Sequence, residues 1–391
     1  MMGGEKRGLW AIMVRSLAQI ARRPLMWVAM LGLPLFLFLF LTTMLDAGLP
    51  TRVPTAIVDR DGTSLSREVT QTLGGMQMVD ITTTANSFSE AKKALQEGKV
   101  YGFFLIPENF QADLLAGRGP AISYYTNMAY FVPGSMLYKT FTATAVYTKA
   151  GVAVNVAQSL GVNPADAVPL MQPVNIQTRG IGNPQLNYGI YISNSFVPGV
   201  LQLMIMLVTC FSLGEEIKRH SSVHLMRMAG GSVYKAVFGK LFPQTVIWWV
   251  VALFMEAWLF KYNHYTMSGS WLWLTLSELM FVVACQGFAL LMFCIIPNLR
   301  LSLSVISLSG ILAFSLAAFS FPEQSMYPAL SIFSWMMPVR YNFLIYANEA
   351  LAGRDIYYSR IWYVVYIIYM VAPLAMVWKL KREFEKPVYC P

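Results

Sequence analysis

The stretch 25–45 reads LMWVAMLGLPLFLFLFLTTML and contains no charged residue. A helix of about 20 apolar residues crosses a hydrocarbon layer of roughly 30 Å, so this stretch is long enough to span a membrane. Basic residues precede it, as they do in a signal peptide. The run is longer than the roughly 7 to 15 residues of a signal-peptide core, and no A-x-A cleavage site follows it. We therefore interpret 25–45 as an uncleaved transmembrane helix.

Five more apolar segments of similar length follow, at 191–213, 243–260, 271–296, 301–320 and 361–378. The whole chain is 56% hydrophobic and 13% charged, whereas a soluble domain is roughly 45–50% apolar and about 25% charged. This composition excludes an ordinary soluble enzyme. It predicts a membrane α-helical fold with six transmembrane helices, the last five of which lie within 191–379.

The charges of the chain are distributed unevenly around these segments. Lys and Arg number 29 against 20 Asp and Glu, a net charge of +9. Basic residues concentrate in the connections 6–23, 218–240 and 379–386, whereas the opposite short connections hold only Lys261, Arg340, Arg354 and Arg360. Because short cytoplasmic loops are enriched in Lys and Arg, both termini are expected in the cytoplasm and 46–190 outside. The basicity reflects orientation, and we expect no nucleic-acid partner.

The gap 46–190 has the pattern of an α/β domain inserted between the first and second spans. Strands are expected at 54–59, 78–83, 100–106 and 122–125. Helices are expected after the capping residues Thr63 or Ser64 and Ser87, and a short one starting at Pro107. A longer helix is expected over 132–160. Strands that alternate with helices favour an α/β layer. Because the domain has no nucleophile elbow or metal-ligand spacing, it is predicted to be a recognition or shielding domain rather than a catalytic one.

Three further segments flank the spans. Within 1–24, the residues Trp10, Met13, Leu17 and Ile20 fall at i, i+3, i+7 and i+10, which predicts an amphipathic elbow helix in the inner interface. The segment 321–360 is broken by prolines but remains apolar. It is expected to form short re-entrant helices in the outer leaflet, the alternative being a loop packed on the external domain. The segment 380–391 is expected to be a cytoplasmic tail.

Motifs for nucleotide, metal and catalytic chemistry are missing from the sequence. The phosphate-binding pattern G-x-x-x-x-G-K-[ST] does not occur, since the nearest fragment, Gly239-Lys240, is followed by Leu241. No Cys or His spacing is typical of a metal site. We therefore expect a non-catalytic chain that binds no cofactor, no metal and no ATP of its own.

The cytoplasmic connection after the second span has an unusual charge pattern. It begins GEEIKR at 214–219, continues SSVHLMRMAGG at 221–231 and reaches Gly239-Lys240. Weak apolar periodicity among these charges predicts a short helix over 215–229, parallel to the membrane and able to contact a cytosolic partner. The alternative is an unremarkable basic loop that follows the positive-inside rule.

This segment resembles the signature of ABC type-2 transporter permeases, with an acidic-basic stretch, a Ser-containing helix and a Gly-Lys pair that opens the third span. Further resemblance to the larger members of the family lies in AIVDRDG at 56–62, in GFFLIPENF at 102–110 and in Arg22-Arg23-Pro24. The sequence departs from the family at Val223 and His224, where a Thr-Leu-Glu-like run is common.

The resemblance implies the membrane subunit of an ATP-driven exporter in a bacterial inner membrane. Its partners would be cytosolic ABC ATPase subunits that hold ATP and Mg, a second permease copy or paralogue, and membrane lipids. The resemblance leaves open whether a periplasmic adaptor and an outer-membrane channel also take part. The helix 215–229 would be the coupling helix. Its expected contact residues are Glu215, Glu216, Arg219, His224 and Arg227.

Among the polar residues inside the predicted spans, Gln202, Glu256 and Glu278 are the candidates for a functional role. A charge at Glu256 or Glu278 costs at least ~2.5 kcal/mol, so these two acids are candidates for a polar relay or a substrate contact. Gln202 could line a translocation interface, the alternative being a lone hydrogen bond between helices. The structural alternative is that Glu256 pairs with Lys261, or that one acid is protonated or reaches the interface. The apolar, aromatic-rich bundle favours a lipid or drug-like substrate. Rival functions are an ATP-driven mechanotransmission or signalling complex and an intramembrane enzyme, the latter disfavoured because no paired catalytic residues occur.

Overall fold

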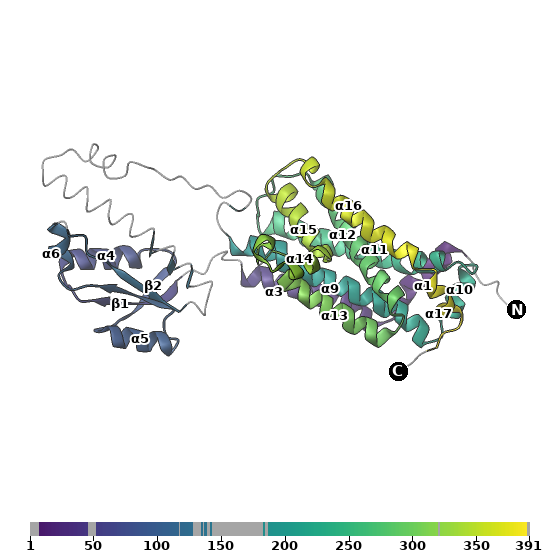
Figure 1. Ribbon diagram of the computed structural model, residues 1–391, viewed down its shortest axis with the longest axis horizontal. Coiled ribbons are helices and arrows are strands. Elements are labelled where there is room, and N and C mark those ends of the chain that lie inside the picture. Colours follow the sequence, from purple (N-terminus) through teal and green to yellow (C-terminus); the bar gives the residue numbers. More distant parts are fainter. Residues whose placement is uncertain are drawn as a thin grey trace. The chain divides into compact units, whose positions relative to one another are not determined.

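The computed structural model describes residues 8–45, 52–116, 118–127, 134–135, 137–138, 141–142, 183, 187–319 and 321–388. Most of the helix expected over 132–160 lies outside the described residues. The chain divides into two compact units, one formed by 1–48 with 179–391 and the other by 49–178. Each unit is described by itself (Figure 1).

The smaller unit contains a four-stranded sheet in the order β2-β1-β3-β4. Its strands are β1 (Val53–Asp59), β2 (Val79–Thr84), β3 (Gly102–Ile106) and β4 (Ser123–Thr126). Strand β1 runs parallel to β2 and β3, and β4 pairs antiparallel with β3. All four strands form close to where the sequence predicts them, although the location of this unit outside the membrane stays a prediction.

Helices α4 (Ser64–Gly74), α5 (Phe88–Gln96) and α6 (Phe110–Leu115) accompany the sheet. The Thr63 hydroxyl accepts a hydrogen bond from the Ser66 amide at 3.3 Å, and the Ser87 hydroxyl accepts one from the Glu90 amide at 3.2 Å, so both predicted caps form. Alternate residues of the strands point to opposite faces. One face packs Ile57 and Phe104 with α4, and the other packs Ala56, Val58 and Phe103 with α5.

The larger unit is a bundle of long apolar helices. Among the described residues, five are long and apolar enough to cross a membrane: Pro24–Met44 (α2, η1 and α3), α9 (Tyr188–Lys218), Val233–Tyr262 (α11, Val233–Ala257, continued by η2, Trp258–Tyr262), α12 (Trp271–Ile295) and α13 (Leu299–Leu316). A sixth is formed if the bent pair Arg360–Ala375 and Lys379–Glu385, which turns by 52°, counts as one span. It comprises α16 (Arg360–Val371), η6 (Ala372–Ala375) and α17 (Lys379–Glu385). The expected membrane-helical bundle is therefore present.

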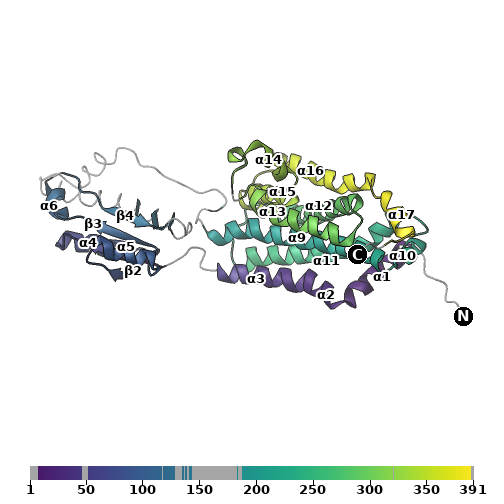
Figure 2. The ribbon, with the colours of Figure 1, turned by 60° about the horizontal axis from the view of Figure 1, so that its bottom comes forward.

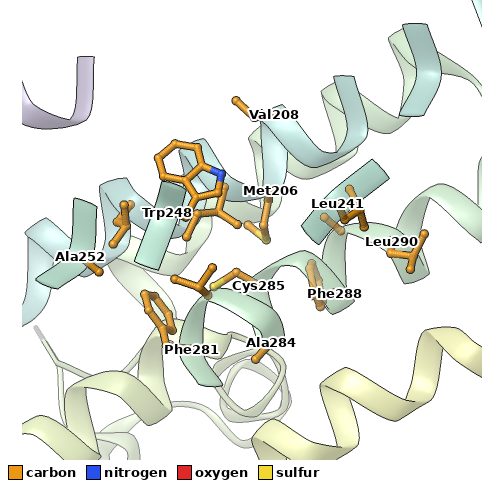
Figure 3. Close-up of a cluster of buried hydrophobic side chains, with 14 of the residues drawn as sticks. Met206, Val208, Leu241, Trp248, Ala252, Phe281, Ala284, Cys285, Phe288 and Leu290 are labelled. Carbon is orange, nitrogen blue, oxygen red and sulfur yellow. The ribbon is translucent and has the colours of Figure 1, made fainter. Parts of the chain in front are cut away.

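Helices α9 and α12 occupy the centre of the bundle. In each, 67% of the most apolar window is buried, against 28% in Pro24–Met44 and in α13. Figure 3 shows part of this core, where Trp248 of α11 lies near Phe281 and Cys285 of α12. The outer helices keep broad apolar faces exposed, as expected for contact with lipid or with another subunit.

Short helices gather at the two ends of the bundle. Helices α1 (Leu9–Ala21), α10 (Ser222–Met228) and α17 lie at one end, and α14 (Pro328–Trp335) at the other (Figure 2). The segment 321–360 also forms η3 (Glu323–Ser325), α15 (Pro338–Ile345), η4 (Tyr346–Leu351) and η5 (Ile356–Tyr358). Helix α14 has an exposed apolar surface, whereas most of α15 is buried in the bundle.

The connection after α9 differs from the single helix expected over 215–229. Helix α9 continues to Lys218, and α10 starts only at Ser222. Between them, His220 adopts a left-handed conformation with φ 55, which interrupts the regular α-helix. The chain therefore forms two helices where one was expected.

Candidate functional site

Five charged residues form a charge cluster at the end of the bundle that holds α1 and α10. Glu215, Glu216 and Lys240 are buried, and Arg15 and Arg23 are partly buried. The Glu216 carboxylate accepts from Arg15 at 2.7 Å and from Lys240 at 2.5 Å, and its side chain is 2% exposed. Glu215 pairs with Arg23. Burial lowers the pKa of Arg23, as does the nearby Arg219, but an arginine keeps its charge.

The charge cluster joins three helices that are distant in the sequence. Arg15 lies on α1, Glu216 on α9 and Lys240 on α11. The Ser16 hydroxyl also donates to the Lys240 carbonyl at 2.7 Å. At Gly239, a Cβ would lie 2.8 Å from the Ile12 side chain, so a glycine is needed for α1 to approach this closely. Helix α1 therefore contacts α9 through an ion pair and α11 through a hydrogen bond and close packing.

The inward face of α1 differs from the amphipathic stripe expected from the sequence. Ile12, Ser16 and Ile20 are buried, whereas Trp10 and Leu17 are exposed. Arg15, which is not part of the expected apolar stripe, points inward and pairs with Glu216. The outward apolar residues fit an interfacial position, but the role of α1 as an elbow stays a prediction.

The structure divides the five expected coupling residues into two groups. Glu215 and Glu216 face the interior and are 7% and 2% exposed. Arg219, His224 and Arg227 are exposed around α10, and we call these three the basic surface. Arg219 also pairs with Glu215 at 2.7 Å, which links the basic surface to the charge cluster. The two carboxylates are therefore placed behind the surface that a partner would meet.

At the opposite end, one face of the continuous helix α15–η4 is directed at the transmembrane helices. This face comprises Val339, Asn342, Tyr346 and Glu349, at i, i+3, i+7 and i+10, and we call it the polar face. All four residues are buried. Its second half is π-helical. This form is rare in proteins as a whole, and where it occurs it is often at a functional site.

Each of the expected intramembrane polar residues contacts this polar face. The Val339 amide donates to Gln202 Oε1 at 2.7 Å. The Asn342 amide group donates to Glu278 Oε1 at 2.9 Å. Glu256 contacts the Tyr346 hydroxyl and lies close enough to Glu278 for mutual repulsion. The structure thus brings the three residues to one helix.

The fourth member of the polar face adds another buried carboxylate. Tyr363 of α16 donates to Glu349 Oε2 at 2.9 Å. Sequence reasoning missed Asn342, Tyr346 and Glu349, although their helical spacing after Pro338 was a usable signal.

The acids near the polar face have no cationic partner among the described ion pairs. Glu256 does not pair with Lys261 in the described part of the chain, which removes one structural alternative. The buried cation of α15, Arg340, pairs with Glu323 instead. Glu256 Oε2 and Glu349 Oε1 accept no hydrogen bond, and the described residues form no metal-binding group. Such acids can take up protons or bind a cationic group.

A bundle of five or six apolar helices defines a multi-pass membrane protein, and the charge cluster and polar face mark its two ends. A family model described as "ABC-2 family transporter protein" matches residues 24–378, and the chain belongs to this family. No curated protein matches the chain. Family membership confirms the resemblance. Members of this family are membrane components of transporters and are generally non-catalytic, and the family implies an ATPase partner.

Proposed function

We propose that this chain is the permease subunit of an ATP-driven exporter, with the ATPase on a partner chain. It pairs with a second copy or a paralogue and moves an amphipathic or hydrophobic, lipid-like or drug-like substrate outward across a bacterial inner membrane. Family membership supports the ATPase partner. The observation that carries the coupling is the position of the charge cluster directly behind the basic surface.

Coupling is proposed to use the two parts differently. Arg219, His224 and Arg227 would meet acidic groups of the ATPase, since complementary charge steers and orients association. Glu215 and Glu216 would not touch the ATPase, because they are buried. They would instead transmit the movement of α10 to α9 and the helices fastened to it.

A charge reversal on the basic surface tests this assignment. In Arg227→Glu, copurification of the ATPase subunit should fall at least tenfold, because an attractive contact becomes repulsive. Arg300→Glu is the matched control, since Arg300 is exposed on α13 outside the basic surface. Equal copurification with both variants would contradict a docking role for α10.

Orientation is tested by labelling single cysteines in a variant that lacks the four natural ones. Ser64→Cys in the smaller unit should react with an impermeant thiol reagent once the outer membrane is permeabilised, whereas Arg227→Cys should react only after lysis. Both positions are exposed, so accessibility within the fold does not bias the comparison. The opposite pattern would reverse the proposed topology.

The rival function is mechanotransmission without passage of a substrate. The buried acids at the polar face favour transport, since unpaired carboxylates inside a membrane bundle are costly and usually line a substrate or proton path. ATPase activity of the reconstituted complex separates the two functions. Stimulation by lipids or hydrophobic drugs supports the exporter, and activity insensitive to all of them supports the rival.

A further inference from the structure

An apolar groove of about 620 Å³ lies between α11, α12 and the bent last span. This volume is within the ~300–1,000 Å³ of typical small-molecule sites. Its walls include Phe238 and Leu241 of α11, Val283 and Leu290 of α12, and Leu374 of η6. Leu241 and Leu290 are drawn in Figure 3. The groove takes no part in the charge cluster or the polar face.

The last span borders the groove where its regular α-helix ends. At Gly287, a Cβ would lie 2.2 Å from the Tyr369 carbonyl, so α12 and α16 are in close contact there. Just beyond, α16 ends at Val371, and Pro373 lies in the short η6 before the 52° bend. The groove lies beside this close contact and extends past the end of α16 along η6.

Inside this apolar groove lies one incompletely paired polar side chain. Gln286 is 4% exposed, and the Thr245 hydroxyl donates to its Oε1 at 2.7 Å. Gln286 Nε2 is buried and has no hydrogen-bond partner within the part of the chain that the structure describes. An unpaired buried amide costs roughly 1–3 kcal/mol, so a ligand that supplies a hydroxyl here gains by pairing it.

The mouth of the groove carries a positive charge. Lys235 is exposed there, at the same end of the bundle as the basic surface, and none of the described residues that line the groove is Asp or Glu. Thr245 lies ten residues further along α11 than Lys235. At 1.5 Å per residue, the cation and the Gln286–Thr245 pair are about 15 Å apart along the helix axis.

We propose that this groove binds a single-chain amphipathic anion that carries a hydroxyl about 15 Å from its charged head, roughly two thirds of the way along an 18-carbon chain. The anionic head would pair with Lys235, and the apolar chain would lie against Phe238, Leu241 and Val283. The hydroxyl would hydrogen bond to Gln286. The inference concerns binding alone and does not depend on ATP-driven export.

Radiolabelled 12-hydroxystearate and stearate, which differ only by the hydroxyl, provide the test. Binding is measured to the full chain in nanodiscs, with empty nanodiscs subtracted. We expect 12-hydroxystearate to bind roughly three- to tenfold more tightly, the equivalent of one added hydrogen bond. In Gln286→Leu this difference should vanish, and in Lys235→Ala both acids should bind severalfold more weakly. Arg300→Ala, a basic residue outside the groove, should bind as the unmodified protein does.

A second pair of variants guards against misfolding of the first. Val283→Trp should fill the groove and abolish binding of both acids, whereas Val250→Trp, on an exposed part of α11 outside the groove, should leave binding unchanged. The proposal is overturned if the two acids bind equally, if their difference survives in Gln286→Leu, or if Lys235→Ala behaves like Arg300→Ala. It is also overturned if disulfide cross-linking through Leu374→Cys shows that a second copy covers the groove and neither acid binds.

Discussion

Neutralising Glu216 should destabilise the bundle far more than neutralising an exposed acid. In Glu216→Gln, the Lys240 side chain, which is only 5% exposed, loses the carboxylate that it pairs with. Arg15, at 16% exposure, loses the same partner. Breaking a buried pair by removing one member costs about 3–5 kcal/mol, because an uncompensated charge remains. We expect a loss of unfolding free energy in this range.

The matched control is Glu385→Gln, which removes an exposed acid paired with Lys381 at 3.8 Å on α17. Exposed pairs of this kind contribute ~0.5 kcal/mol or less. Unfolding would be measured by titrating detergent-solubilised protein with sodium dodecyl sulfate and following tryptophan fluorescence. Glu216→Gln that is no less stable than Glu385→Gln would refute the reasoning.

A double variant separates the ion pair from its surroundings. Glu216→Gln combined with Lys240→Met removes both partners and leaves no unpaired lysine. Its loss of stability should be smaller than the sum of the two single losses by ~1–3 kcal/mol, as expected for residues in contact. Strict additivity would show that the two side chains do not interact.

Two further predictions concern substitutions in the interior of the bundle. Gly287→Ala should lower the unfolding free energy by at least ~1–3 kcal/mol in the same assay, because its Cβ would overlap the Tyr369 carbonyl. Gly32→Ala is the control and should be tolerated, since the nearest atom to its Cβ lies at 3.8 Å. Glu278→Gln keeps an oxygen that accepts from Asn342 but cannot ionise. Substrate-stimulated ATPase activity should fall in this variant while copurification of the ATPase is unchanged, and full stimulation would make Glu278 a purely structural residue.

The sequence predicts the membrane spans well because their signal is local. A run such as 25–45 must be apolar along its whole length to cross a membrane, and this requirement is visible without knowledge of its neighbours. The strands and caps of the smaller unit are predictable for the same reason. Thr63 and Ser87 cap helices through residues only three positions away.

The partners of the site residues are less predictable because their contacts are distant in sequence. Arg15 and Glu216 are separated by 201 positions, and either side chain alone has the pattern of a surface charge. Burial was the missing information for Glu216, since the acidic-basic pattern was equally compatible with contact to an ATPase. The interruption at His220 is a backbone conformation that periodicity does not reveal.

Helix α9 is long enough to connect the two ends of the bundle. Its 31 residues correspond to about 46 Å, well beyond the ~30 Å hydrocarbon layer. Gln202, which holds the polar face, and Glu216, in the charge cluster, lie on this one helix, about 21 Å apart. Pro198, where the helix can bend, precedes both of them. The stretch between them contains no proline, so under the proposed function a displacement of α10 would be transmitted along α9 to Gln202 and the polar face.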